Sequence, residues 1–233
     1  MDVSVVIPAL NEEKYIARCL KAVRAQKFNG TFEIIVSDGM SSDKTPQIAK
    51  KYADKVVFEK TRTIAAGRQR GIAAARGKII AFTDADAEPH PGWLAELCAP
   101  FSDPCVVCTY GMLLLYDGTD FENALCKYVF PPYFKVLQFL NLPAGAGSNI
   151  AIRASALERI GGFNRKLAAG EDIELEKRLT SLGRLVFVEN AVAEVSSRRI
   201  RKWGFPRFMA YHTLNTLRVH FSGTSDPKYE PVR

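Results

Sequence analysis

Asp84 and Asp86, separated by Ala85, follow an apolar, β-branched run at residues 78–83. The run is predicted to be a buried strand, so the two carboxylates should stand at its carboxyl end. In an open α/β sheet, ligands bind outside the carboxyl ends of the strands, and a hard divalent cation that bridges phosphate oxygens needs one or two protein carboxylates there. The competing interpretation is a solvated turn, because aspartate is also favoured in turns.

Two other loops are predicted to share this edge of the sheet. Residues 8–13 follow the first predicted strand, and residues 37–45 follow the second. Neither loop has the glycine pattern of a dinucleotide-binding turn or of a P-loop, so a nucleotide would have to be held by side chains. Asp38 can accept a hydrogen bond from a base N–H or a ribose hydroxyl, and Arg68 or Lys60 can meet phosphate charge.

The elements that must position these residues alternate between strands and helices in the first half of the chain. The predicted strands are residues 3–7, 32–37, 55–58 and 78–83, and the predicted helices are residues 12–26, 45–53 and 63–76. Asn11 is predicted to cap the first helix. The alternation predicts an α/β fold with a mostly parallel, doubly wound, Rossmann-like sheet.

The pattern is less regular in the second half. Residues 117–142 are rich in aromatic side chains and have no clear assignment. The predicted strands are residues 106–116, 149–153, 185–188 and 191–195, and the predicted helices include residues 171–182 and an amphipathic stretch at 203–221. We expect one compact unit in which the elements of the second half are added to the fold of the first.

Length and composition are those of an ordinary globular protein. The chain has 233 residues, of which 47% are hydrophobic and 24% charged. Its five cysteines are odd in number and lie in apolar surroundings, which favours free thiols and a reducing, cytoplasmic compartment. No leader sequence and no run of about 18 apolar residues is found, so a transmembrane helix is not expected, although attachment to a membrane surface stays open.

Much of the net charge of +7 is local. Five basic side chains lie within ten residues: Arg198, Arg199, Arg201, Lys202 and Arg207. Such a cluster suits a pyrophosphate, an anionic membrane or a nucleic acid, and charge alone does not choose among them. Because no nucleic-acid-binding motif accompanies the cluster, we expect no nucleic-acid partner.

Several short motifs, in order and spacing, resemble those of the family 2 inverting glycosyltransferases, which have the GT-A fold. They are residues 5–12 (VVIPALNE), 37–45 (SDGMSSDKT), 67–71 (GRQRG), 84–86 (DAD), 147–153 (GSNIAIR), and 161–163 (GGF) leading to 170–172 (GED). The resemblance covers residues 3–190. It implies a nucleotide-sugar-binding half at residues 1–110 and an acceptor-binding half with a C-terminal amphipathic helix at residues 111–233, within one catalytic domain.

The resemblance also implies roles on the donor side. Asp38 would read the nucleotide base, Asp84 would contact the ribose or the base, and Asp86 would bind Mg²⁺ or Mn²⁺ across the diphosphate of a UDP or GDP sugar. The other implied nucleotide contacts are Pro8, Ala9, Glu12, Lys60, Arg68 and Ala85. A divalent cation there would stabilise the charge that develops on the departing diphosphate.

On the acceptor side, the resemblance implies that Asp172 is the general base, with Glu171 beside it as an alternative. A carboxylate at a helix N-terminus should stay ionised at neutral pH, as a base must. The alternative for both residues is plain N-terminal helix charge, which the residues from Gly162 to Asp172 make the less favoured interpretation. Gly147, Ser148 and Asn149 would belong to the acceptor-side strand.

One departure from the family concerns its processive synthases, many of which carry Q-x-x-R-W and transmembrane helices. The nearest sequence here is residues 199–203 (RIRKW), which lacks the glutamine. Transfer of a single sugar is therefore expected. Arg198, Arg199 and Arg201 are predicted to fold over the donor pyrophosphate as a basic lid, and a solvated basic patch is the alternative.

Two segments bear on the acceptor. Residues 128–140 hold five aromatic side chains, and residues 203–211 combine aromatic with basic side chains. Such segments either pack in the core or contact a lipid surface. We expect a glycan or lipid-phosphate acceptor, in particular a polyprenyl phosphate or a lipid-borne saccharide reached from the cytoplasmic face of a membrane.

Two other functions fit part of the pattern. A sugar-phosphate nucleotidyltransferase also needs Mg²⁺ carboxylates on a doubly wound sheet, but it would want a phosphate loop rich in glycine and arginine where this chain has the acidic Glu12 and Glu13. A non-catalytic nucleotide-sugar-binding module would have no use for a base at Asp172.

Overall fold

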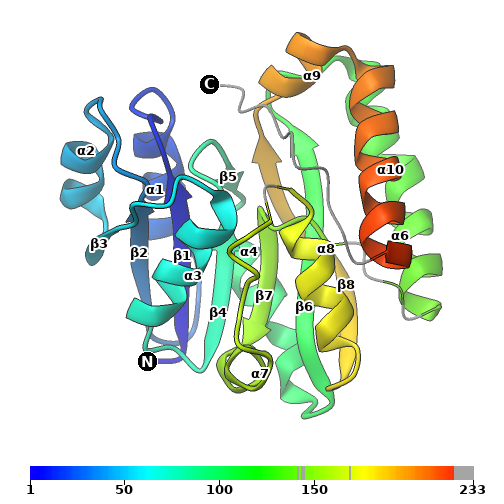
Figure 1. The fold of residues 1–233 in the computed structure, drawn as a ribbon, viewed down its shortest axis with the longest axis horizontal. Helices are drawn as coiled ribbons and strands as arrows, with labels where there is room; N and C mark the ends of the chain where they lie inside the picture. Colours follow the sequence, from blue (N-terminus) through cyan, green and yellow to red (C-terminus); the bar gives the residue numbers. More distant parts are fainter. Residues whose placement is uncertain (141, 143–144, 168, 223–233) are drawn as a thin grey trace.

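The computed structural model describes residues 1–140, 142, 145–167 and 169–222. Its first half alternates strands and helices as predicted (Figure 1). The elements are β1 (Val3–Ala9), α1 (Ile16–Arg24), β2 (Phe32–Asp38), α2 (Thr45–Tyr52), β3 (Lys55–Phe58), α3 (Ile64–Ala74) and β4 (Ile79–Thr83).

The second half adds four strands and most of the helices. They are β5 (Glu88–Pro89), α4 (Trp93–Cys98), η1 (Ala99–Ser102), β6 (Val106–Leu115), α5 (Asp120–Ala124), η2 (Leu125–Val129), α6 (Phe130–Phe139), β7 (Asn149–Arg153), α7 (Ala154–Ile160), α8 (Glu171–Leu179), β8 (Arg184–Val195), α9 (Arg198–Trp203) and α10 (Phe205–Ser222). The two strands predicted at 185–188 and 191–195 are one, β8. The amphipathic stretch predicted at residues 203–221 is α10, which begins at Phe205, because Gly204 has a φ of +80° and separates it from the end of α9.

All the strands form one sheet in the order β3-β2-β1-β4-β7-β6-β8-β5. Strands β3, β2, β1 and β4 are parallel, β7 is antiparallel to both β4 and β6, and β8 is parallel to β6 and antiparallel to the short β5. The predicted fold class is therefore confirmed. Strand β6 runs through residue 110, so one sheet joins the two expected halves, and the division of function between them stays a prediction.

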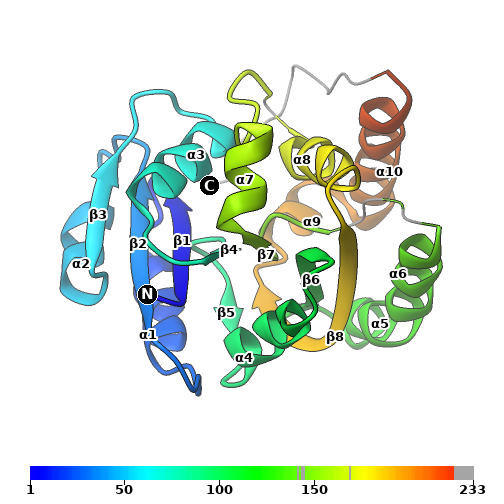
Figure 2. The ribbon, with the colours of Figure 1, turned by 90° about the horizontal axis from the view of Figure 1, so that it is seen from below.

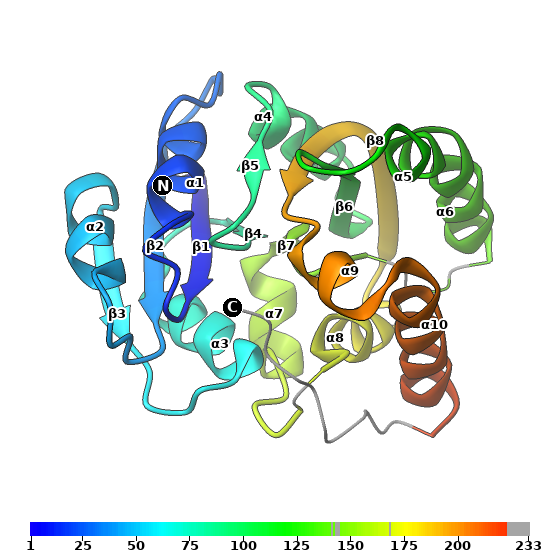
Figure 3. The same cartoon turned by 90° about the horizontal axis from the view of Figure 1, so that it is seen from above.

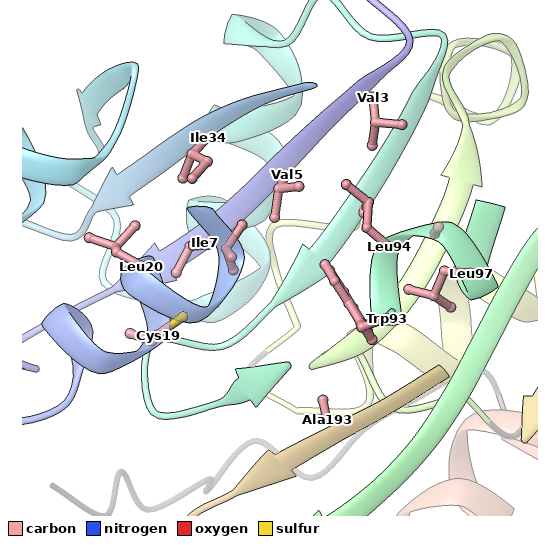
Figure 4. Packing of buried hydrophobic residues seen from close by; sticks show 14 of the residues in the cluster. Val3, Val5, Ile7, Cys19, Leu20, Ile34, Trp93, Leu94, Leu97 and Ala193 are labelled. Carbon is pink, nitrogen blue, oxygen red and sulfur yellow. The ribbon is translucent and has the colours of Figure 1, made fainter. Parts of the chain in front are cut away.

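Helices cover both faces of the sheet (Figure 2). On one face, Val3, Val5 and Ile7 of β1 belong to an apolar cluster with residues of α1 and α4, including the fully buried Trp93 (Figure 4). On the other face, Val6 belongs to a cluster with residues of α3, α7 and α8. A strand that is buried on both faces reads as a continuous apolar run, which explains the sequence of β1.

The first helix begins later than predicted. Tyr15, not Asn11, is the residue before α1, and Asn11 has a left-handed backbone with a φ of 56°. Its side-chain oxygen accepts a hydrogen bond from the backbone N–H of Ser42 at 2.8 Å. Asparagine tolerates this conformation better than most residues, so Asn11 joins the loop after β1 to the loop after β2 instead of capping a helix.

Candidate active site

Asp38 ends β2 at the sheet edge where Ala9 ends β1, and these two residues are partners in the parallel register. Its side chain is buried, and Oδ1 accepts a hydrogen bond from the backbone N–H of Ser41 at 2.8 Å. Oδ2 is buried and has no hydrogen-bond partner among the described residues. A buried carboxylate oxygen without a hydrogen-bond partner is energetically costly, so a ligand N–H or hydroxyl that donates a hydrogen bond to Oδ2 would be favoured there. Pro8 precedes Ala9 and contacts α3, where it lies close to Gly67.

Arg68 joins the aspartate pair to the start of α8. Its Nη2 lies 3.0 Å from Oδ1 of Asp84, and its Nη1 lies 2.5 Å from Oε1 of Glu171. The side chain is 2% exposed, so the two ion pairs form inside the protein. Arg68 was predicted to meet phosphate charge, but both ends of its guanidinium are engaged by carboxylates of this chain, since burial of an arginine requires such partners.

Asp172 and Glu171 have different surroundings, although they are neighbours. Oδ2 of Asp172 accepts a hydrogen bond from the backbone N–H of Gly147 at 2.9 Å, which brings the predicted base to the predicted acceptor loop. A Cβ atom on Gly147 would come within 2.2 Å of Nη1 of Arg68, so only glycine fits this contact. Burial and Asp172 raise the pKa of the Glu171 carboxyl, and Arg68 opposes the rise. Glu171 is committed to its buried ion pair, and Asp172 is the better candidate base.

Arg198 bridges two carboxylates from distant parts of the chain. Its Nη2 lies 2.6 Å from Oε1 of Glu12 and 3.1 Å from Oδ2 of Asp86. Burial raises the pKa of Asp86 to about 6, against the opposing effect of Arg198. The next residue, Arg199, interacts electrostatically with Asp84 and Asp86, and burial lowers its pKa. The start of α9 therefore lies at the aspartate pair. Figure 3 shows the side of the molecule on which α9 lies.

The charged side chains described above are called the cluster, and they are Glu12, Arg68, Asp84, Asp86, Glu171, Asp172, Arg198 and Arg199. The side chains of three predicted site residues lie outside it. Arg201 makes two hydrogen bonds to Glu122, at 3.0 and 2.9 Å, because one turn of α9 faces α5. Asn149 is fully buried and uses its amide in the core, where it accepts from Trp93 and donates to the backbone oxygens of Met112 and Ala191. Lys60 is exposed on the loop after β3.

Two predicted site residues remain, Ser148 on the acceptor side and Ala85 on the donor side, and both are small. Ser148 is buried beside Gly147, and Ala85 is buried between the two aspartates. Both are placed next to the polar groups of the cluster by chain connectivity, and their side chains offer little chemistry of their own. Ser148 can donate through its hydroxyl.

One residue near the cluster was missed by the sequence interpretation. His212 of α10 interacts electrostatically with Asp172 and Arg199, and burial lowers its pKa. Its Nε2 atom is buried and has no hydrogen-bond partner among the described residues. Helix α10 packs on the start of α8: a Cβ atom on Gly170 would lie 2.6 Å from Nδ2 of Asn215. The only signal in the sequence was a histidine on an amphipathic stretch, which does not indicate a site by itself.

The donor set of the cluster consists of carboxylate oxygens, which suits Mg²⁺ or Mn²⁺. Among the described residues, no group of three or more histidine, cysteine and acidic side chains is arranged to hold a metal by itself. A cation here would therefore be held by Asp86 together with oxygens of a bound phosphate, which is how Mg²⁺ is commonly bound. The residues fit this kind of shared site.

Comparison with known proteins identifies the family of the chain. Residues 4–161 match the model of the family described as glycosyl transferase family 2. The chain belongs to this family. It is 26% identical over 201 residues to glycosyltransferase AglE of Haloferax volcanii, an alignment that covers 78% of the chain and 62% of AglE. The chain thus spans less than two thirds of this curated relative.

Two solved structures of transferases share the GT-A fold. The mannosyltransferase PcManGT from Pyrobaculum calidifontis, in complex with GDP-Man and Mn²⁺, has a TM-score of 0.75 at 22% identity and covers 99% of this chain and 67% of its own. S. aureus TarS 1-349, in complex with UDP-GlcNAc, has a TM-score of 0.68 at 22% identity and covers 85% of this chain and 59% of its own. The family 2 chain described above has the same fold.

Proposed function

We propose that this family 2 chain transfers one sugar, with inversion, from a nucleoside-diphosphate sugar to an acceptor, with the help of a divalent cation. The observation that carries the proposal is the buried bridge from Asp84 through Arg68 to Glu171, at 3.0 and 2.5 Å. The bridge joins the aspartate pair, which suits the donor diphosphate, to the helix start that bears Asp172. A donor and an acceptor held on the two sides of Arg68 would lie close enough to react.

In the proposed reaction, an acceptor oxygen attacks the anomeric carbon of the sugar while the bond from that carbon to the diphosphate oxygen breaks on the opposite face. Asp172 takes the proton of the acceptor hydroxyl. The hydrogen bond from Gly147 holds the carboxylate of Asp172 in place for this step. Mg²⁺ or Mn²⁺, bound through Asp86, would stabilise the charge on the departing nucleoside diphosphate.

The donor nucleotide is proposed to be UDP or GDP. The buried Oδ2 of Asp38 would accept a hydrogen bond from the base N–H, and Asp84 would contact the ribose or the base. The proposal is supported by the solved structures of similar fold, one with GDP-Man and Mn²⁺ and one with UDP-GlcNAc. Both bases present an N–H to a carboxylate, so the base itself stays open.

Arg198 and Arg199 are proposed to bind the donor pyrophosphate. Both guanidinium groups lie at the aspartate pair, where a pyrophosphate and its cation would replace the carboxylates as their partners. Arg201 is left out of this role because it is bound to Glu122. Charge reversal of Arg199 should weaken donor binding at least about tenfold. Unchanged donor affinity would remove this role.

The acceptor is proposed to be lipid-linked, either a polyprenyl phosphate or a lipid-borne saccharide at the cytoplasmic face of a membrane. All five cysteines are free thiols, as in a reducing compartment. No helix in the described part of the chain has the length and apolar character needed to cross a bilayer. The proposed contact with the membrane is peripheral.

Product analysis tests the proposal against its two rivals. With a panel of UDP and GDP sugars and Mn²⁺, a glycosyltransferase releases nucleoside diphosphate in the presence of an acceptor. A sugar-phosphate nucleotidyltransferase would exchange pyrophosphate, and a binding module would release neither. Binding of a sugar nucleotide without release of nucleoside diphosphate, across lipid-phosphate and glycan acceptors, would contradict the proposal.

A further inference from the structure

Two helices in the second half of the chain each expose a row of apolar side chains. The first row, called the α6 stripe, lies on and next to α6 and consists of Val129, Tyr133, Val136, Phe139 and Leu140. The second, called the α10 stripe, consists of Leu214, Leu217 and Phe221. Phe139 is 88% exposed and Phe221 is 81% exposed, values that are unusual for phenylalanine. Spacings of three and four residues place each row on one side of its helix.

The stripes are not the surfaces by which the helices pack on the domain. Phe134 points inward from α6 and contacts Tyr110 and Phe187, with ring centroids 6.0 and 5.1 Å apart. On α10, Asn215 and Val219 are buried against Gly170. Each helix therefore has one face packed on the domain and a row of largely exposed apolar side chains on another, and exposed apolar surface of this kind is typical of an interaction site.

Both stripes lie near the acceptor side of the cluster. Figures 1 and 3 place α6 and α10 at the same end of the molecule, opposite β3 and α2. Helix α10 contacts α8, which begins with Glu171 and Asp172. A surface bound by the α10 stripe would therefore lie beside the proposed base.

The charges around the stripes are positive. Residues 198–222 contain no acidic residue and six basic ones: Arg198, Arg199, Arg201, Lys202, Arg207 and Arg218. Two acidic residues near these elements are paired within the chain, Glu122 with Arg201 and Glu189 with Lys135. Basic and aromatic side chains beside an apolar helix face are complementary to an anionic lipid surface.

We propose that the α6 stripe and the α10 stripe together dock this chain on an anionic membrane. The exposed apolar side chains would enter the region between headgroups and acyl chains, and the exposed Lys202, Arg207 and Arg218 would face lipid phosphates. The proposal deepens the proposed function, on which it rests for the choice of a lipid-linked acceptor. Docking itself is a binding event that needs no turnover.

Flotation with vesicles tests the proposal. The whole chain should float with vesicles of phosphatidylglycerol and phosphatidylcholine and should not float with phosphatidylcholine alone. The double variants Val136→Ser/Phe139→Ser and Leu214→Ser/Leu217→Ser should each bind at least about tenfold more weakly. Phe58→Ser is the matched control, because Phe58 is 46% exposed on β3 at the other end of the molecule, and it should bind like the original chain.

Several results would overturn the proposal. Unchanged flotation of both stripe variants, or equal flotation with neutral vesicles, would contradict docking by these surfaces. A chain that does not float but dimerises in solution, and becomes monomeric in the stripe variants, would assign the stripes to a protein partner. Thermal unfolding of each variant controls for misfolding, because substitutions at exposed positions should leave the unfolding temperature unchanged.

Donor turnover separates the two proposals. With a water-soluble acceptor, transfer of the sugar and release of nucleoside diphosphate should be the same in the original chain and the stripe variants. Normal release by a chain that does not float would contradict docking alone. Flotation without sugar transfer to any acceptor, and so without release of nucleoside diphosphate, would contradict the proposed function alone.

Discussion

The Nη2 atom of Arg198 lies 3.1 Å from Oδ2 of Asp86. The residue proposed for the donor pyrophosphate thus contacts the carboxylate proposed for the cation, and Glu12 holds the same guanidinium from the other side at 2.6 Å. A positive charge already stands beside Asp86 in the structure. A cation bound to Oδ2 of Asp86 would replace this contact, and a pyrophosphate would give Arg198 a new partner.

The first prediction concerns Asp86. A sugar nucleotide with Mn²⁺, at about one hundred times its dissociation constant, should stabilise the chain by about 2.7 kcal/mol. In Asp86→Ala this stabilisation should disappear, because the cation loses its proposed protein ligand. Thermal unfolding with and without ligand measures the difference. Glu158→Ala, an exposed carboxylate on α7, is the control and should keep the full shift.

The second prediction concerns the buried bridge. Arg68→Met should lower the free energy of unfolding by about 3–5 kcal/mol, because Asp84 and Glu171 lose their shared cation inside the protein. Arg24→Met removes an exposed ion pair to Asp54 and should lower it by no more than about 1 kcal/mol. Urea unfolding compares the two. Equal values would show that the bridge at Arg68 adds nothing to stability.

The third prediction concerns the base. With an acceptor hydroxyl, Asp172→Asn should lower kcat about 10²- to 10⁴-fold with little change in the KM of the donor. Asparagine can still accept the hydrogen bond from Gly147, so the loop should keep its position. Glu174→Gln, on the same helix, should keep its activity. A variant at Asp172 that retains most of its activity would point to a phosphate acceptor, which needs little help from a base.

The fourth prediction concerns stability at low pH. Burial would raise the pKa of Glu33, but hydrogen bonds from Ser4, Arg76 and Lys55 outweigh it and lower the pKa from 4.5 to about 2. The folded state therefore holds the ionised form more firmly than the unfolded state does. This contribution, about 3 kcal/mol, is present above pH 4.5 and is lost as the pH falls toward about 2.

Urea unfolding at several pH values between 2 and 6 checks this prediction. The original chain should lose stability more steeply with falling pH than Glu33→Gln, in which the titrating group is gone. Glu158→Gln should follow the original chain. Parallel curves for all three proteins would contradict the assignment to Glu33.

Strands β1, β2 and β4 could be predicted because each is a short apolar run whose pattern is set by neighbouring residues. The helices α5, η2 and α6 could not, because their aromatic side chains fit a helix, a strand or a buried loop equally well. In the folded chain, Phe134 of α6 packs on Tyr110 and Phe187, which are distant in sequence.

The ion pairs of the cluster lie beyond any local pattern. Arg68 and Glu171 are 103 residues apart in the sequence, and Arg198 and Glu12 are 186 apart. Each arginine could have met a phosphate, a solvent molecule or a carboxylate, and the sequence favours none of these. The same holds for Asn149, whose type suited an acceptor site but whose amide is used within the core.

The sequence by itself determined the doubly wound fold, the place of Asp84 and Asp86 after a buried strand, and the place of Asp172 at the start of a helix, because periodicity and chain connectivity are local properties. Tertiary structure alone decided that Arg68 joins Asp84 to Glu171, that Arg198 contacts Asp86, and that α6 and α10 each keep an apolar face outside the core. Those outcomes depend on which distant surfaces pack together, and packing determines which charges are buried and must find a partner.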